Sequence, residues 1–288
     1  MTELFGFFFQ WADAFAFLVL ASIGLAIIFG MMGVINLAHG EFIMCGAYVT
    51  VLCSRTGLPL PVCMLLGALA AGAIGILLER LIIRHLYHRL YDSIVATWAI
   101  SLIATQGMLI VAGPSIEGIK TPFGSFSVGG LSFSEYRVVL MLIALLLLAG
   151  LYLLFMRTRY GVHARATIQN ADMARALGVD TRRVYSLTFG LGAALAGLAG
   201  ALYAPTTTTV PTMGGAFIVQ AFVTVVVGGA NALIGAAPAA AILGVVQSSL
   251  AATWGQTIGQ IGLLIAVILV VRLLPKGLSG LLSRRDGG

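Results

Sequence analysis

Charged residues are scarce in this chain. Only 9% of its 288 residues are Asp, Glu, Lys or Arg, whereas 60% are apolar and the mean hydropathy is +1.05. Soluble domains carry roughly 25% charged residues, so the composition excludes an ordinary soluble fold. The apolar runs are continuous and do not alternate with polar residues, which argues against a transmembrane β-barrel. We therefore predict an all-α, polytopic helical membrane protein.

Sequence motifs for several kinds of chemistry are also missing. There is no G-x-x-x-x-G-K-[ST] for ATP phosphates, no H-E-x-x-H and no G-x-S-x-G. The three cysteines, Cys45, Cys53 and Cys63, are odd in number and lack metal-ligand spacing, so neither a disulfide framework nor a zinc site is indicated. The net charge of +6 comes without basic stripes interleaved with aromatics, which argues against nucleic-acid binding. We expect no catalytic residue, metal or cofactor in this chain.

Nine apolar runs are candidate membrane spans, since a full crossing needs roughly 20 helical residues. They cover residues 12–32, 42–53, 60–83, 93–112, 138–156, 186–204, 217–229, 233–252 and 258–274. The second and seventh runs are short, which is typical of discontinuous helices that line a transport pathway. Alternatively, both are tilted spans or have misassigned ends. We predict eight or nine transmembrane segments in a single membrane domain over residues 1–288.

Basic residues predict the orientation, because short loops rich in Lys and Arg stay in the cytoplasm. They cluster at Arg80, Arg84, His85, His88 and Arg89, in the loop 157–185, and at Arg272, Lys276, Arg284 and Arg285. Nine alternating crossings place all three clusters on one side. The C-terminus is then cytoplasmic, and the N-terminus and the connection 113–136 are external.

The stretch 33–42 (GVINLAHGEF) places Asn36, His39 and Glu41 between two apolar runs. Polar groups at membrane depth are costly unless they face protein or water, so these are candidates for the translocation pathway. Gly40 allows a sharp turn, and Glu41 would lie at the positive end of a short helix. Alternatively, Asn36 and His39 only cap helices at a cytoplasmic turn. His39 and Glu41 would not share a helical face, which argues against a metal or general-base site.

The loop 157–185 is the longest polar stretch between apolar runs and carries six arginines. Asn170 suits an N-cap, residues 171–177 are helix formers, and Gly178 fits the position after the helix end; Asp180 or Thr181 then caps the next helix. So short a helix needs a packing partner. We expect it to dock into a cytoplasmic protein, and a bulky residue at Ala174 to abolish function; the alternative is a solvated connector. The proposed docking segment comprises Asn170, Ala171, Asp172, Met173, Ala174, Arg175, Leu177 and Gly178.

Glycine and threonine mark two further candidate positions along the pathway. Gly228 and Gly229, within VVVGGANALIGA (225–236), allow a kink or tight turn. Thr206 and Thr207 precede Pro211 and would line the external mouth. Both places are otherwise ordinary helix ends. Small residues spaced three and four apart in 67–75 and 190–200 favour close packing within the bundle, or against a second membrane subunit.

Five segments together carry a family resemblance that covers nearly the whole chain. They are GVINLAHGEF (33–42), ATWAISL (96–102), RATIQNADMARALGVDTRRV (165–184), LTFGLGAALAGLAGAL (187–202) and VVVGGANALIGA. In this order they resemble the inner-membrane permeases of branched-chain amino-acid ABC importers, the LivH type. The first and third segments are the specific ones. The superfamily also holds permeases for urea and short amides, toward which ATWAISL and IQN lean.

The resemblance implies a non-catalytic permease in the bacterial cytoplasmic membrane. Its partners would be a second related permease, two ATPase subunits that bind ATP and Mg²⁺, and an extracytoplasmic solute-binding protein. Residues 170–178 match the family's coupling helix, and residues 36–41 its signature at the discontinuous helices. Asn231 and Ala232 depart from the family's glycine motif. A stand-alone secondary carrier or channel is the alternative of another class, although few carboxylates lie within the spans.

Overall fold

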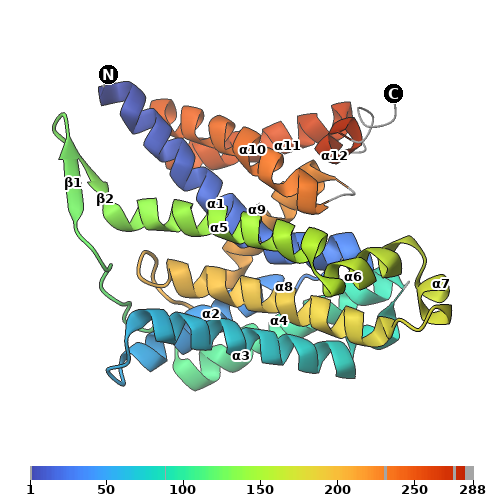
Figure 1. The fold of residues 1–288 in the computed structure, drawn as a ribbon. Helices are drawn as coiled ribbons and strands as arrows, with labels where there is room; N and C mark the ends of the chain where they lie inside the picture. The colour runs from blue at the N-terminus through green and yellow to red at the C-terminus, as the bar shows by residue number, and fades with distance from the viewer. Residues whose placement is uncertain (1, 88, 230–231, 275–276, 283–288) are drawn as a thin grey trace. The chain divides into compact units, whose positions relative to one another are not determined.

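The computed structural model describes residues 2–87, 89–229, 232–274 and 277–282, and they are mostly helical (Figure 1). The apolar helices are α1 (Thr2–Met32), α2 (His39–Ser54), α3 (Leu60–Leu81), α4 (Leu90–Ala112), α5 (Glu135–Arg157), α8 (Thr181–Tyr203), α9 (Met213–Gly228), α10 (Ala232–Trp254) and α11 (Gln256–Leu273). Shorter elements are the 3₁₀ helix η1 (Ile83–Leu86), α6 (Arg159–Gln169), α7 (Ala171–Ala176), α12 (Gly277–Leu282) and the strands β1 (Ser125–Val128) and β2 (Leu131–Ser134).

Seven helices in the described part of the chain are long and apolar enough to cross a membrane. The two helices predicted to be short, α2 and α9, have 16 residues each. At 1.5 Å per residue each measures about 24 Å, less than the roughly 30 Å hydrocarbon core of a bilayer. The polytopic helical fold is confirmed, with seven long spans and two short helices at the predicted places.

Eight of the nine apolar helices begin before their predicted apolar run, and α3 begins at the predicted residue, Leu60. The first helix begins at Thr2 rather than at residue 12, because Phe5 and Phe9 pack on Phe133 of β2 with ring centroids 5.2 and 4.7 Å apart. The helix α8 begins at Thr181, as its predicted cap indicates, ahead of the apolar run that starts at residue 186. Its N-cap Asp180 accepts a hydrogen bond from the Arg183 N–H, so the basic turn before the apolar run is already helical.

The described residues form two compact units. Unit 1 comprises Met1–Ser22, Thr121–Leu148 and Gln220–Gly288, and unit 2 comprises Ile23–Lys120 and Ala149–Val219. Within unit 1, α10 packs against α11 and α12, and the Trp11 indole N–H donates to the Ala241 carbonyl at 3.1 Å. The β1–β2 hairpin turns at Gly129 and Gly130, which both have positive φ.

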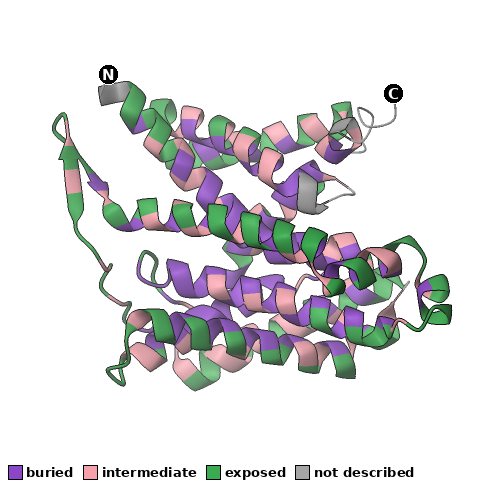
Figure 2. Cartoon of the chain, in the orientation of Figure 1, coloured by how far each residue is buried: buried purple, intermediate pink, exposed green. Residues whose placement is uncertain are grey.

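In unit 2, α8 packs against both α2 and α3. Figure 2 shows buried residues along α8. The packing is backbone to backbone: a Cβ on Gly46 of α2 would collide with the Gly197 backbone of α8, and one on Gly200 would collide with the Ile43 carbonyl. Such close approach needs glycine at the contact. The prediction that the small-residue runs serve packing within the bundle is confirmed.

Candidate transport site and coupling surface

A break in the helical path separates α1 from α2. Gly33 adopts a φ of +61° after α1 ends, and the chain becomes helical again at His39. The Asn36 side-chain oxygen accepts a hydrogen bond from the Ala38 N–H at 3.1 Å, which holds the turn. No side chain caps α2; the His39 and Glu41 N–H groups of its first turn donate to the Asn36 and Ala38 carbonyls at 3.3 and 3.1 Å.

The break lies at the depth of the middle of α8. A Cβ on Gly24 of α1 would lie 3.1 Å from the His39 ring and 3.2 Å from the Gly192 carbonyl carbon. Gly192 is near the midpoint of α8, which is long and apolar enough to span the bilayer. This depth argues against a cytoplasmic turn and supports a discontinuous helix.

Helix α4 supplies hydroxyl groups to the break. Thr97 accepts a hydrogen bond from the Leu37 N–H at 3.1 Å, and Ser101 donates to the Glu41 carboxylate at 2.8 Å. Thr105 of the same helix also interacts with this carboxylate. The second Glu41 oxygen is buried and has no hydrogen-bond partner among the described residues; the same is true of the Asn36 amide nitrogen. The break therefore carries unused polar groups inside an apolar bundle.

The starts of the two short helices meet at this break. A Cβ on Gly214, in the first turn of α9, would lie 2.7 Å from the Gly40 carbonyl carbon and 3.2 Å from a Glu41 carboxylate oxygen. Asn36, His39, Gly40 and Glu41 are therefore brought together with the beginning of α9. Among the described residues, no three His, Cys, Asp or Glu side chains are grouped as a metal site would require.

The other predicted pathway residues lie elsewhere. Thr206 and Thr207 are exposed, and both hydroxyls donate to the Tyr203 carbonyl at 2.9 and 3.0 Å at the end of α8. Gly229 has a φ of +85° and ends α9, so the predicted tight turn is present there. Gly228 packs against Gly235 within unit 1. The Asn231 of the atypical motif lies outside the described residues, and nothing is described of the side chain of Ala232.

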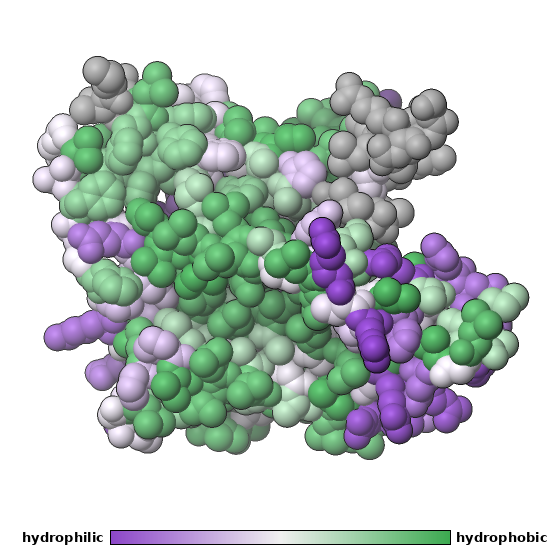
Figure 3. All heavy atoms as spheres, in the orientation of Figure 1, coloured by the Kyte–Doolittle hydropathy of each residue, from purple (hydrophilic) through white to green (hydrophobic). Residues whose placement is uncertain are grey.

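The basic loop folds into two consecutive helices, α6 and α7. Thr158 caps α6, and the Asn170 side chain accepts the Met173 N–H at 2.9 Å to cap α7. Gly178, at φ +88°, follows the end of α7. The predicted caps at Asn170 and Asp180 and the glycine stop are confirmed. Figure 3 shows the hydrophilic side chains of unit 2 gathered at the end that carries these helices.

Helix α7 has one buried residue and an exposed apolar face. Ala174 is 3% exposed, whereas Met173 is 58% and Leu177 is 79% exposed. Ala174 belongs to the predicted docking segment, but its side chain is covered within this chain and is not available to a partner. A bulky residue there would disturb the loop's own packing. The large apolar side chains open to a partner are Met173 and Leu177, which lie four apart on one side.

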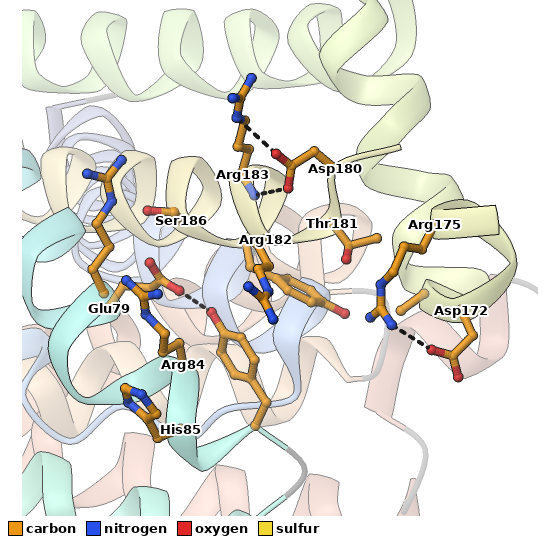
Figure 4. A pocket seen from close by; sticks show the side chains of 14 residues that line it. Glu79, Arg84, His85, Asp172, Arg175, Asp180, Thr181, Arg182, Arg183 and Ser186 are labelled. Atoms are coloured by element: carbon orange, nitrogen blue, oxygen red, sulfur yellow. Dashed lines mark hydrogen bonds and ion pairs between the residues drawn. The ribbon is translucent and has the colours of Figure 1, made fainter. Parts of the chain in front are cut away.

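A cleft of about 750 Å³ lies between the end of α3, η1, α7 and the start of α8 (Figure 4). Its basic lining residues are Arg80, Arg84, His85, Arg175, Arg182 and Arg183, and its acidic ones are Glu79, Asp172 and Asp180. The Tyr87 hydroxyl donates to Glu79 at 2.5 Å. Burial raises the pKa of Tyr87, and its hydrogen bond to Glu79 raises this pKa further, so the phenol stays protonated at neutral pH.

The motifs of the sequence do not single out the hydroxyl residues of α4 or the buried acid Glu79. Ser93, Thr97, Ser101 and Thr105 recur at every fourth position, so they form one hydroxyl-bearing stripe on α4. That spacing was the available signal. Glu79 is buried, but in the sequence it is one acid beside a basic cluster. Only its tertiary contact with Tyr87 distinguishes it.

Seven long apolar helices, a polar break in the bundle and a folded basic loop define a multi-pass membrane permease. A family model described as the permease component of the branched-chain amino acid transport system matches residues 7–273, so the chain belongs to this family. The predicted LivH-type relationship is confirmed. No solved structure matches the chain.

Relatives of this chain are named as branched-chain amino acid permeases. The chain is 29% identical to the high-affinity permease protein BraD of Pseudomonas aeruginosa, over 91% of each chain. It is 31% identical to the probable permease LivH of Methanocaldococcus jannaschii, over 91% of this chain and 88% of the relative. It is 28% identical to LivH of Escherichia coli K12, over 91% and 90%. These names give the urea and amide alternative no support.

Proposed function

We propose that this chain is a non-catalytic permease subunit of an ATP-driven ABC importer for branched-chain amino acids in the bacterial cytoplasmic membrane. Family membership and the names of the relatives support the substrate class. The loop 157–185 and the C-terminus lie in the cytoplasm in this proposal, as their arginines favour. A second homologous permease, two ATPase subunits that bind ATP and Mg²⁺, and an external solute-binding protein complete the transporter.

The observation that carries the coupling role is the form of α7. It is a capped helix in the basic loop, anchored by Ala174, and it exposes Met173 and Leu177. Isolated helices this short are unstable, so the caps and the buried Ala174 are needed to keep α7 folded. In this proposal the folded helix fits into a groove of the ATPase.

A contiguous series of contacts connects α7 to the break. Helix α7 contacts α8, and α8 packs backbone to backbone on α2 at Gly46–Gly197 and Ile43–Gly200. Helix α2 begins at the break beside Glu41. We infer that closure of the ATPase pair shifts α7, and that α8 transmits the shift to the break and biases the permease between two arrangements. Substrate then crosses between the two permeases.

Reconstitution tests the function and the substrate together. The chain, its partner permease, both ATPases and the binding protein are placed in proteoliposomes, and uptake of labelled leucine and labelled urea is measured with and without ATP. We expect leucine uptake that needs ATP and all subunits. The chain alone, driven by an ion gradient, is the control for a secondary carrier; uptake in that arm, or ATP-driven uptake of urea but not leucine, would contradict the proposal.

A further inference from the structure

The cleft between the end of α3, η1, α7 and the start of α8 contains arginines that form no ion pair with a neighbouring carboxylate. Arg175 pairs with Asp172 at 3.3 Å, and Arg183 pairs with Asp180 at 2.9 Å. In contrast, Arg80, Arg84 and Arg182 form no hydrogen bond or ion pair with any described residue. Five arginines against three carboxylates leave the lining with a net charge of +2. The cleft therefore favours an anion.

Neutral hydrogen-bond donors complete the lining. Ser186 is 7% exposed, and its hydroxyl has no hydrogen-bond partner among the described residues. A buried hydroxyl without a partner is costly unless a ligand or water satisfies it. Glu79, the buried acid of the cleft, already accepts the Tyr87 hydroxyl. One buried donor and three unpaired guanidinium groups suit the several oxygens of a phosphate.

The cleft lies at the ends of two membrane-spanning helices. Glu79 and Arg80 are in the last turns of α3, and Thr181 to Ser186 open α8. Tyr87 and Tyr185 line the same cleft with ring centroids 5.0 Å apart, and tyrosines concentrate at the membrane–water boundary. This is the level at which phospholipid headgroups lie.

Apolar surface continues from the cleft along both spans. Leu77 is 55% exposed and shares a helical face with Arg80, three residues on. Leu187 is 54% exposed and shares a face with Arg183, four residues before. A molecule with its phosphate in the cleft could place acyl chains along these leucines. A soluble phosphate compound would gain nothing from them.

We propose that this cleft binds the phosphate group of an anionic phospholipid headgroup. Met173 and Leu177, the exposed apolar residues proposed to bind the ATPase, do not line the cleft, whereas Ala171, Asp172 and Arg175 of the same segment do. The bound lipid ties α7 to the ends of α3 and α8. The proposal that this cleft binds a phospholipid holds whether or not ATP drives transport.

Lipid titration of the purified full chain tests this site. The protein is delipidated in detergent, and binding of phosphatidylglycerol and phosphatidylcholine is measured by native mass spectrometry. The test variant is Arg84→Gln/Arg182→Gln. The matched control is Arg157→Gln/Arg159→Gln, which removes two exposed arginines of the same loop that do not line the cleft. Ser186→Ala is a second, smaller change for the case that the double variant does not fold.

We expect the wild type to prefer phosphatidylglycerol at least tenfold over phosphatidylcholine. Because each arginine near the membrane surface contributes about 1 kcal/mol, the test variant should lose roughly tenfold or more in phosphatidylglycerol affinity. Ser186→Ala should lose a smaller factor, and the control should stay within about twofold of the wild type. Equal binding of both lipids by the wild type, or equal losses in test and control variants, would overturn the proposal.

Two further arms distinguish other ligands of the cleft. Inorganic phosphate is titrated as a competitor, and displacement of phosphatidylglycerol at millimolar phosphate would show a soluble-phosphate site instead. Copurification of the ATPase subunits is measured in the same variants. If the test variant loses the ATPases and keeps its lipid preference, the cleft binds protein and the lipid proposal is wrong. Loss of lipid preference with normal ATPase binding and ATP-driven uptake would support it.

Discussion

Single hydroxyl groups fix the geometry of the helix break. Thr97 of α4 accepts a hydrogen bond from the Leu37 N–H, and its own hydroxyl donates to the Ser93 carbonyl, with 2.7 Å between the two oxygens. Ser101, one turn further, donates to Glu41. An apolar bundle offers few other partners for such groups, because water is excluded from the bilayer core. The position of Asn36 and Glu41 thus depends on side chains about 60 residues away in the sequence.

Replacing Thr97 with valine tests this dependence. The side chain keeps its shape and loses the acceptor for the Leu37 N–H, which costs about 1–3 kcal/mol for a buried group. We expect Thr97→Val to unfold about 2 °C or more below the wild type in a thermal scan of the purified protein. Thr97→Ser keeps the hydroxyl and should remain close to the wild type. Equal unfolding temperatures for both variants would show that Thr97 does not hold the break.

Helices α2 and α8 of unit 2 pack closely because glycines at their contact have no side chain. The pairs Gly46–Gly197 and Gly200–Ile43 bring the backbones of α2 and α8 into contact. The sequence predicted these faces from the spacing of small residues. It did not predict α6, whose Gly161, Ala164 and Thr167 face inward while its other residues are largely polar. A polar helix of this kind is distinguished from a loop only by what it packs against.

A single methyl group at Gly200 should loosen the α2–α8 contact. We expect Gly200→Ala to lower the free energy of unfolding by about 1–3 kcal/mol, since an added Cβ meets the Ile43 carbonyl and the backbones must move. Gly150→Ala is the control: it lies within α5 with nothing within 4 Å of the added Cβ. Chemical unfolding of both purified variants measures the difference. A Gly200→Ala protein as stable as Gly150→Ala would contradict the packing described.

At the scale of the whole molecule, composition and run length were enough to predict a polytopic helical membrane protein. They also predicted nine apolar helices, two of them short. They could not predict which polar residues meet. Asn36, Glu41, Thr97 and Gly214 lie in three segments that only the tertiary fold brings together. The same limit applies to the coupling loop: its caps followed from local chemistry, but the burial of Ala174 depends on packing that the sequence does not show.

The proposed coupling of ATP hydrolysis to transport through α7 is tested most directly by changing the exposed face of this helix. Met173→Glu/Leu177→Glu places two charges on side chains that are 58% and 79% exposed, so the fold should be unaffected. Val162→Glu, on the exposed face of α6, is the matched control at 54% exposure. Copurification of the ATPase subunits and ATP-driven leucine uptake are measured for the three proteins in the reconstituted transporter.

We expect the α7 variant to insert normally, to lose most of its bound ATPase and to import leucine at least tenfold more slowly, because a charge in a desolvated groove is strongly unfavourable. The α6 control should retain both activities. Normal ATPase binding and uptake in the α7 variant, or equal losses in both variants, would contradict the role assigned to this helix.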